Sequence, residues 1–250
     1  MRPVNTICLS LAGGILWMLP ASVFGDGEFP AAALGSLASE EYKDRVQAQR
    51  DLVAWGQEKP DQAGERLLQE HDAATDPEVR LRLREALKEV VISEHQRKDG
   101  QGFVGIQMGD LNVAIPGVDE PRGGVVVTRV HPDTPAMKAG LQAQDVVVAL
   151  NDLKWPAGVG ARESFANEIR RHKPGEKVML EVLRGAELKK IEMTLGVRPM
   201  GMDQAVMPLL MLPGDPVEDP MANLKVAEKE AKDAYFDRWL AEKRAAAGKP

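Results

Sequence analysis

The chain has 250 residues, of which 44% are hydrophobic and 28% are charged, and these fractions are typical of a soluble globular protein with one or two modest domains. The formal net charge of −6 at pH 7 argues against nucleic acid as the main partner, because phosphate binding requires clustered lysine and arginine. Aromatic residues make up only 4% of the chain, so we expect an aliphatic core.

The first 25 residues have the pattern of a secretory signal peptide. Arg2 gives a positive start, an uncharged and mostly apolar run follows from Ile7 to Leu19, and Val23 and Gly25 are the small residues expected before a cleavage site. The apolar run is too short to cross a bilayer unaided, because a spanning helix takes about 20 residues. We therefore expect an exported protein, periplasmic or secreted, without a membrane span after cleavage. The alternative is an uncleaved N-terminal anchor.

The residues that could carry chemistry form no motif. Cys8 is the only cysteine and lies inside the expected signal peptide, so the mature chain would have no disulfide and no thiol nucleophile. The four histidines are scattered without the spacing of metal ligands. The hydrolase patterns Gly-x-Ser-x-Gly and His-Glu-x-x-His do not occur in the sequence. We therefore expect a protein that is not an enzyme and needs no metal or cofactor.

Residues 26–38 are expected to form a flexible lead-in, and residues 39–98 a helical module. Ser39 is the expected N-cap of its first helix. The last helix of the module should begin at Asp76 and Pro77, where Asp caps the helix and Pro takes its first position.

Residues 76–87 resemble the second half of a HEAT-type helical repeat. However, the module has only about 60 residues, which is fewer than the three repeats that a free solenoid needs. Two alternatives stay open at this point. One is a small helical hairpin or three-helix unit that packs on its neighbour, and the other is a fragment of a protein-binding solenoid.

Beyond Lys98 the apolar pattern changes to a period of two and to short apolar runs, which predict strands. Two short helices, Thr134–Ala139 and Ala161–Arg171, fit between them. The expected strands are Val104–Met108, Val125–Val130, Val146–Leu150, Val178–Leu183 and Leu188–Leu195.

Three sequence motifs in this region resemble a PDZ domain of the bacterial type, as found in envelope quality-control proteases. They are Gly-Phe-Val-Gly-Ile at 102–106, the segment 135–151 that contains Ala-Gly-Leu and Asp-Val-Val, and Lys-Pro-Gly within 173–185. The resemblance covers residues 101–198, about two fifths of the chain. It implies a small, partly open β-barrel with two short helices, which binds extended peptides and performs no chemistry itself.

The expected fold class of the whole chain is α+β. The PDZ-like barrel follows the helical module. A linker rich in proline and methionine is expected over 199–220, and a C-terminal helix over 221–246.

The resemblance also implies a peptide-binding site. Phe103, Val104, Gly105 and Ile106 would form a loop that binds the carboxylate of a peptide, through the backbone amides of the last three. The strand that continues through Gln107 and Met108 would pair with the peptide.

The opposite wall of the implied groove is the helix over 161–171. Phe165 and Ile169 are four residues apart and so share one face of it. With Ile106 and Met108 they would line an apolar pocket, which predicts a ligand with an aliphatic or aromatic C-terminal residue. The alternative is that Phe165 and Ile169 only belong to the core.

Two features depart from the family pattern. Gln144 stands where the family commonly has glycine, and glutamine adopts a positive φ poorly, so this turn could be looser or of another type. The insert Gly109–Gly123 is longer than a minimal strand connection, and it could overhang the groove and narrow its access.

The expected function is that of a non-catalytic adaptor or scaffold that binds C-termini or extended segments by strand addition. Its partner would be an envelope protease or assembly. One alternative is a structural or autoinhibited module, in which residues 205–212 lie in the groove or the terminal helix covers the apolar stripe of 79–91. Another is a degenerate subunit associated with a protease.

Overall fold

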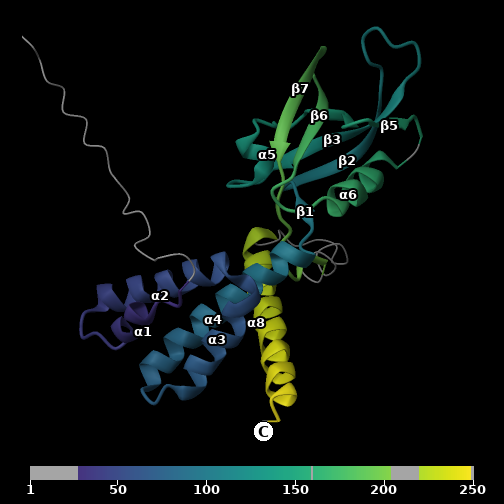
Figure 1. The fold of residues 1–250 in the computed structure, drawn as a ribbon. Helices are drawn as coiled ribbons and strands as arrows, with labels where there is room; N and C mark the ends of the chain where they lie inside the picture. The colour runs from purple at the N-terminus through teal and green to yellow at the C-terminus, as the bar shows by residue number, and fades with distance from the viewer. Residues whose placement is uncertain (1–27, 159, 204–219, 249–250) are drawn as a thin grey trace, which may run out of the picture.

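The computed structural model describes residues 28–158, 160–203 and 220–248. The expected signal peptide and most of the expected linker lie outside the described residues. The chain forms two parts (Figure 1), a helical unit and a β domain over residues 102–197. The helical unit contains α1 (Ala31–Ser36), α2 (Tyr42–Glu58), α3 (Pro60–Ala73), α4 (Pro77–Asp99) and α8 (Pro220–Ala246).

A single apolar core receives residues from each of these five helices. Leu52 of α2, Leu87 of α4 and Phe236 of α8 are each fully buried within it. The C-terminal helix thus covers the apolar stripe of α4, which was one of the alternatives open from the sequence. Although the β domain separates α4 from α8 in sequence, both helices belong to one unit (Figure 1). A HEAT-type repeat stays a prediction.

Polar contacts border the packing of α8 on its neighbours. The guanidinium of Arg84 donates to Asp237 at 2.9 Å, and the Nζ of Lys243 donates to Glu65 at 2.7 Å. Lys88 donates to Asp233 as well. These pairs lie around the apolar contact and help to set the position of α8 along α3 and α4.

The lead-in expected over 26–38 is partly helical, so that prediction was wrong for residues 31–36. Ala33 and Leu37 are buried in the core of the helical unit. A helix of six residues is too short to be stable in water by itself, because the first turn costs more than its hydrogen bonds return. Contacts with the rest of the unit therefore stabilise α1.

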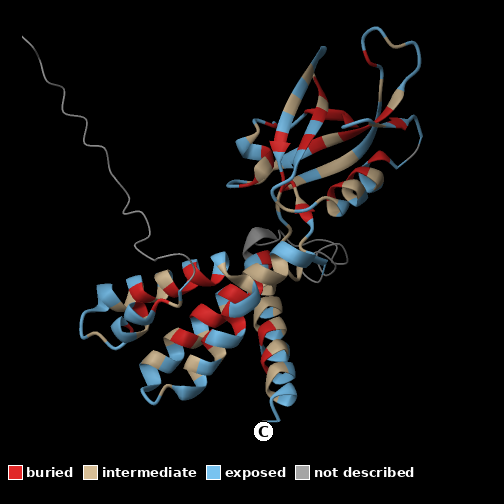
Figure 2. Ribbon diagram, viewed as in Figure 1, coloured by how far each residue is buried: buried red, intermediate tan, exposed pale blue. Residues whose placement is uncertain are grey.

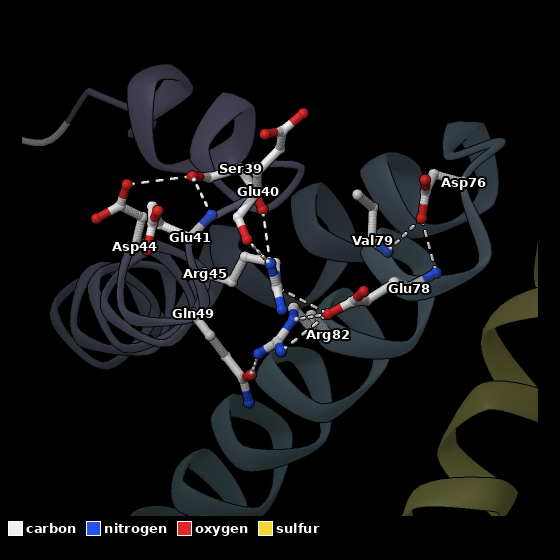
Figure 3. Close-up of polar contacts among 10 residues, drawn as sticks. All are labelled: Ser39, Glu40, Glu41, Asp44, Arg45, Gln49, Asp76, Glu78, Val79 and Arg82. Atoms are coloured by element: carbon white, nitrogen blue, oxygen red, sulfur yellow. Dashed lines mark hydrogen bonds and ion pairs between the residues drawn. The ribbon is translucent and has the colours of Figure 1, made fainter.

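The starts of α2 and α4 are tied together by side chains (Figure 3). The guanidinium of Arg45 donates to the backbone oxygens of Ser39 and Glu40 at 2.7 and 2.8 Å and pairs with Glu78 at 2.8 Å. Asp76 accepts hydrogen bonds from the amides of Glu78 and Val79, which confirms the predicted N-cap of α4. Ser39 does not cap α2 directly, since that helix begins at Tyr42.

The β domain is a curled half-barrel with two helices, and the predicted strands are all present in it. Its main sheet has the order β2-β3-β5-β4-β6-β7, and a further pairing of β3 with β4 curls it. The short strands β1, β5 and β8 were not expected. The elements are β1 (Gly102–Phe103), β2 (Ile106–Val113), β3 (Arg122–Val130), α5 (Pro135–Lys138), β4 (Val146–Leu150), β5 (Leu153–Pro156), α6 (Ala161–Arg171), β6 (Lys177–Arg184), β7 (Glu187–Thr194) and β8 (Gly196–Val197).

The core of the β domain lies inside the curl of the sheet. It joins Val125, Val147 and Leu180 of the strands to Phe165 and Ile169 of α6. Figure 2 shows the buried residues in two groups, one between the helices of the helical unit and one within the β domain. The two parts therefore have separate cores.

The tip of the insert 109–123 packs away from the groove, whereas its residues Asp110 and Asn112 accept hydrogen bonds from the amides of Arg162 and Gly158. The two ends of this insert extend the β2–β3 hairpin, which stays paired as far as Val113 and Arg122. Ile115 then packs with Val146, Val148 and Leu183 in a second small cluster. Because residues alternate between the two faces of a strand, this cluster lies on the face of the sheet opposite the main core.

The turn before β4 keeps the positive backbone angle despite the glutamine. Gln144 has φ of 74°, a conformation that costs most side chains free energy. The next residue, Asp145, is buried and accepts two hydrogen bonds from Arg184 at 2.7 and 2.8 Å. This bidentate pair fixes the turn to β6, so the turn is not loose.

Candidate functional site

The candidate site is the edge of the sheet formed by β2. This strand pairs with β3 on one side only, and α6 packs near it. The carbonyl oxygen of Gly105 accepts a hydrogen bond from the amide of His131 at 3.0 Å. Because backbone groups alternate in direction along an antiparallel strand, the amide of Ile106 points to the open edge. A further strand could pair there.

The loop before β2 is held through its carbonyl groups rather than its amides. The oxygen of Val104 accepts from the amide of Ala136 at 3.0 Å, and that of Gly105 accepts from His131. Within the described part of the chain, the amides of Val104 and Gly105 have no hydrogen-bond acceptor. Two neighbouring backbone donors are thus available to an anion.

Gly105 is required at its position for two reasons. Its φ is +84°, and a Cβ there would lie 2.3 Å from the Cβ and Cγ2 of Thr134. Thr134 is itself buried and donates to the backbone oxygen of His131 at 2.7 Å, so it has no room to move aside. The loop therefore lies too close to α5 for any side chain at residue 105.

An apolar cavity of about 130 Å³ lies beside the loop, between β2 and α6. Its volume is close to that of the roughly 150 Å³ cavity that holds a benzene molecule in another protein. It therefore suits one aliphatic side chain or one ring. The residues that line it are Gly102, Phe103, Val104, Gly105, Ile106, Met108, Phe165, Ala166, Ile169, Arg170, Arg198 and Met202.

The structure brings most of the residues predicted from the sequence to this cavity. Phe165 and Ile169 are buried in the core and also line the cavity, so the two alternatives weighed for them are compatible. Gln107 is the exception among the predicted groove residues. Its side chain is exposed and does not line the cavity, and the residue pairs with Arg129 of β3.

Sequence reasoning missed five residues of the lining. Ala166 and Arg170 follow Phe165 and Ile169 on α6, and their spacing of four residues could have indicated a shared face. Gly102 was quoted only as part of the loop motif. Arg198 and Met202 gave no signal, because they come from the segment after the last strand.

The far end of the groove is closed by hydrogen bonds between its two walls. The side chain of Asp110 on β2 accepts from the amide of Arg162 at the start of α6, at 2.8 Å. The side chain of Asn112 accepts from the amide of Gly158 at 3.0 Å. The open part of the β2 edge therefore extends from Ile106 to Gly109.

The base of the loop is fixed by the turn after α6. The amide of Gly102 donates to the backbone oxygen of His172 at 2.8 Å. The ring of His172 bonds the carboxylate of Glu176 at 2.7 Å, and this hydrogen bond lowers the pKa of Glu176 below its ordinary value of 4.5.

The Nζ of Lys173 donates to the backbone oxygen of Lys98 at the end of α4, at 2.7 Å. This hydrogen bond joins the β domain to the helical unit.

Other types of site are not evident in the described residues. They contain no group of three or more histidine, cysteine, aspartate and glutamate residues that could hold a metal ion. Among these same residues, no helix has the length and apolar character needed to cross a membrane.

The family model for the PDZ domain matches residues 102–195. This region of the chain is a PDZ domain. The match begins at the loop with the unpaired amides and ends at Leu195, just before β8. The PDZ domain thus includes β2 and α6, the two walls of the groove, whereas Arg198 and Met202 lie beyond it.

Several relatives of the chain are named as probable periplasmic proteases. A probable periplasmic serine endoprotease, DegP-like, of Ectopseudomonas mendocina is 33% identical over 114 residues, which are 43% of this chain and 23% of that protein. The protein of the same name from Pseudomonas fluorescens is 32% identical over 139 residues, or 54% of this chain and 27% of that one. The chain therefore spans about a quarter of the length of these relatives.

Solved structures of HtrA-type proteases also match. One of them, the protease AlgW with a decapeptide, is 27% identical to this chain, with a TM-score of 0.33. The match covers 46% of this chain and 35% of that one.

Proposed function

We propose that this protein is a non-catalytic adaptor or scaffold that binds C-termini or extended segments of other proteins in its PDZ groove. The observation that carries the proposal is the open edge of β2, which lies beside an apolar cavity and two unpaired amides. PDZ domains bind peptides by adding them as a strand to such an edge.

In this proposal a peptide pairs with the stretch from Ile106 to Gly109 and places its C-terminal carboxylate at the amides of Val104 and Gly105. Its last side chain fills the cavity between Ile106 and Ile169. Full burial of a leucine or phenylalanine side chain is worth about 1.5–3 kcal/mol. The proposed ligand therefore ends in an aliphatic or aromatic residue.

Titration of fluorescent peptides ending in Leu, Phe or Asp into the chain without residues 1–25 tests the proposal. We expect the Leu and Phe peptides to bind and the Asp peptide to bind at least about tenfold more weakly, because most of the cavity wall is apolar and a charged side chain loses its hydration there. The variant Ala166→Arg fills the cavity and should abolish binding. Glu163→Arg adds the same side chain at an exposed position of α6 that does not line the cavity and should leave binding unchanged. Equal binding by the two variants would contradict a site in this cavity.

The closed far end of the groove leads to a prediction about ligand length. Because Asp110 bonds the start of α6 and Asn112 bonds the loop before it, a peptide residue upstream of the fourth from the C-terminus has no free strand edge to pair with. Peptides of four and eight residues with the same last four should bind the protein about equally. In the double variant Asp110→Ala, Asn112→Ala, the longer peptide should bind more tightly than the shorter one. A clear preference of the unaltered protein for the longer peptide would contradict this boundary.

Export and an envelope partner belong to the same proposal. The support is the signal-peptide pattern of the sequence and the similarity to proteins named as periplasmic endoproteases. Fractionation of cells that produce the full chain tests export, and crosslinking from a photoreactive residue at Gln107 tests the partner. The absence of catalysis is tested by incubation with casein, for which we expect no cleavage.

A second candidate is a structural module whose groove is covered by its own chain. The burial of Phe236 and Leu240 of α8 in the helical core supports a structural role for the C-terminal segment. Occupancy of the groove by residues 205–212 concerns residues outside those described. Replacing their apolar side chains with serine tests it, because self-occupancy predicts a higher peptide affinity for that variant and our proposal predicts an unchanged one.

A further inference from the structure

Arg198 reaches the peptide groove from outside the matched PDZ region. It follows β8, which pairs with β1 at the start of the loop, and its backbone amide donates to the oxygen of Gln101 at 2.9 Å. These contacts fix Arg198 beside Gly102 and Phe103. The Arg198 side chain lines the cavity and is only 12% exposed.

The guanidinium of Arg198 is neutralised by a residue of its own chain. Its Nη2 atom lies 2.5 Å from the carboxylate of Asp203, and its Nη1 atom donates to the sulfur of Met202 at 3.7 Å. The side chain of Asp203, in contrast, is 89% exposed. A largely buried cation is therefore paired with a carboxylate that is free to leave into solvent.

The segment that carries Asp203 is held in place by α8. At Gly201, a Cβ would lie 2.8 Å from the backbone oxygen of Ala227 and 3.1 Å from the Cβ of Ala231. The chain thus packs closely on α8 between Arg198 and Asp203. This packing keeps the carboxylate of Asp203 within reach of the groove.

We propose that Arg198 binds the C-terminal carboxylate of the peptide ligand, and that Asp203 takes this place when no peptide is bound. The inference rests on the proposed function. The amides of Val104 and Gly105 supply hydrogen bonds but no net charge, whereas a guanidinium supplies a charge and can donate two parallel hydrogen bonds to a carboxylate. The peptide carboxylate exchanges with that of Asp203, so the charge on Arg198 is compensated in both states.

Arg170 provides a matched control, because it is the other arginine that lines the cavity. Its guanidinium bonds the side chain of Asn167 on its own helix. Only Arg198 is joined to the loop through the β1–β8 pairing. The same loss of charge at the two positions should therefore have different effects.

The test compares a leucine-ended peptide with a free carboxylate to the same peptide with an amidated end. The unaltered protein should bind the free acid at least about tenfold more tightly, since hydrogen bonds between charged groups are stronger than those to a neutral amide. Arg198→Gln should reduce the ratio of the two affinities to a few-fold, and Arg198→Lys should restore part of it. Arg170→Gln should keep the full ratio. Asp203→Asn should raise affinity for the free acid, because it removes the competing carboxylate.

An unchanged acid-to-amide ratio in Arg198→Gln would overturn the inference, and so would weaker binding by Asp203→Asn. Loss of the ratio in Arg170→Gln alone would assign the role to Arg170 and overturn it too. If amidated peptides with an internal aspartate lose affinity in Arg198→Gln, the group bound is an acidic side chain, which also contradicts the proposal. Failure of the unaltered protein to bind any peptide would instead refute the proposed function.

Discussion

The helical unit and the PDZ domain both have well-buried cores, but they differ at their borders. The helices α1–α4 and α8 surround one shared core. Ion pairs such as Arg84–Asp237 border the contact between α4 and α8. The PDZ domain curls its sheet instead, which leaves β2 as an edge. Helices satisfy their backbone groups internally, whereas an edge strand presents unpaired ones. The unpaired backbone groups that binding by strand addition requires therefore lie in the PDZ domain, whose fold leaves β2 as an edge.

The largest expected effect tests whether α8 belongs to the helical core. Phe236→Ala should lower the free energy of unfolding by about 3–5 kcal/mol, because it leaves a cavity where a fully buried ring packs. Urea denaturation followed by circular dichroism measures it. Val226→Ala, at a position of the same helix that is 58% exposed, should change stability by less than about 0.5 kcal/mol. Similar values for the two variants would show that α8 does not share the core.

The next effect concerns the PDZ loop. Gly105→Ala should combine backbone strain of about 1–2 kcal/mol with a steric clash of about 1–3 kcal/mol against Thr134. It should also weaken peptide binding at least about tenfold, because the loop amides would move. Gly117→Ala is the matched control, since Gly117 has a similar φ of +80° and open space around its Cβ position. It should show the strain alone and bind peptide normally, and loss of binding there would contradict a role specific to residue 105.

A smaller, stabilising effect is expected at the strained turn of the PDZ domain. Gln144→Gly removes the cost of φ at 74°, about 1–2 kcal/mol, and adds the entropy cost of glycine, about 0.5–1 kcal/mol. The net gain should be a few tenths to 1 kcal/mol, measured by thermal unfolding. Ala143→Gly, at the preceding exposed residue without a positive φ, should destabilise the protein slightly. A loss of stability in both variants would show that Gln144 is not strained.

The smallest effect concerns the ion pairs that border α8. The hydrogen bond from Lys88 lowers the pKa of Asp233 below its ordinary value of 3.8. A carboxylate with a lowered pKa contributes stability above its ordinary pKa, and this contribution is lost as the pH falls through the lowered value. Asp233→Asn should therefore destabilise the protein at pH 7, by at most about 1 kcal/mol for a pair of this exposure, and should equal the unaltered protein near pH 2. A constant difference between pH 7 and pH 2 would contradict the pairing.

Much of the PDZ domain could be predicted from the sequence, because its signals are local. The bounds of α6 and β4 agree with the expected Ala161–Arg171 and Val146–Leu150, since the apolar pattern and the polar or turn-forming residues next to it define them. The strands β1 and β8 have two residues each and form only because they meet each other across the whole domain. The helix α1 was missed for a similar reason, as its stability depends on the burial of Leu37.

The candidate site divides in the same way. Phe103–Ile106 follow from the glycine pattern of the loop, and Phe165 and Ile169 follow from their spacing on a helix. The role of Ala166 could not be predicted, because the alanine side chain has too little apolar surface to indicate that its face of the helix lines a cavity. Arg198 and Met202 could not be predicted, because no local pattern connects them to the groove, whose walls β2 and α6 come earlier in the sequence.

The sequence alone was enough to predict a PDZ domain with a glycine-containing loop over residues 101–198, because the motifs that resemble the family each lie within a few neighbouring positions. Only the tertiary structure decided that α8 returns to complete the core of α1–α4 and that Arg198 lies at the groove. Both arrangements depend on contacts between residues that are distant in the chain, and burial and charge pairing select such contacts only once the chain has folded.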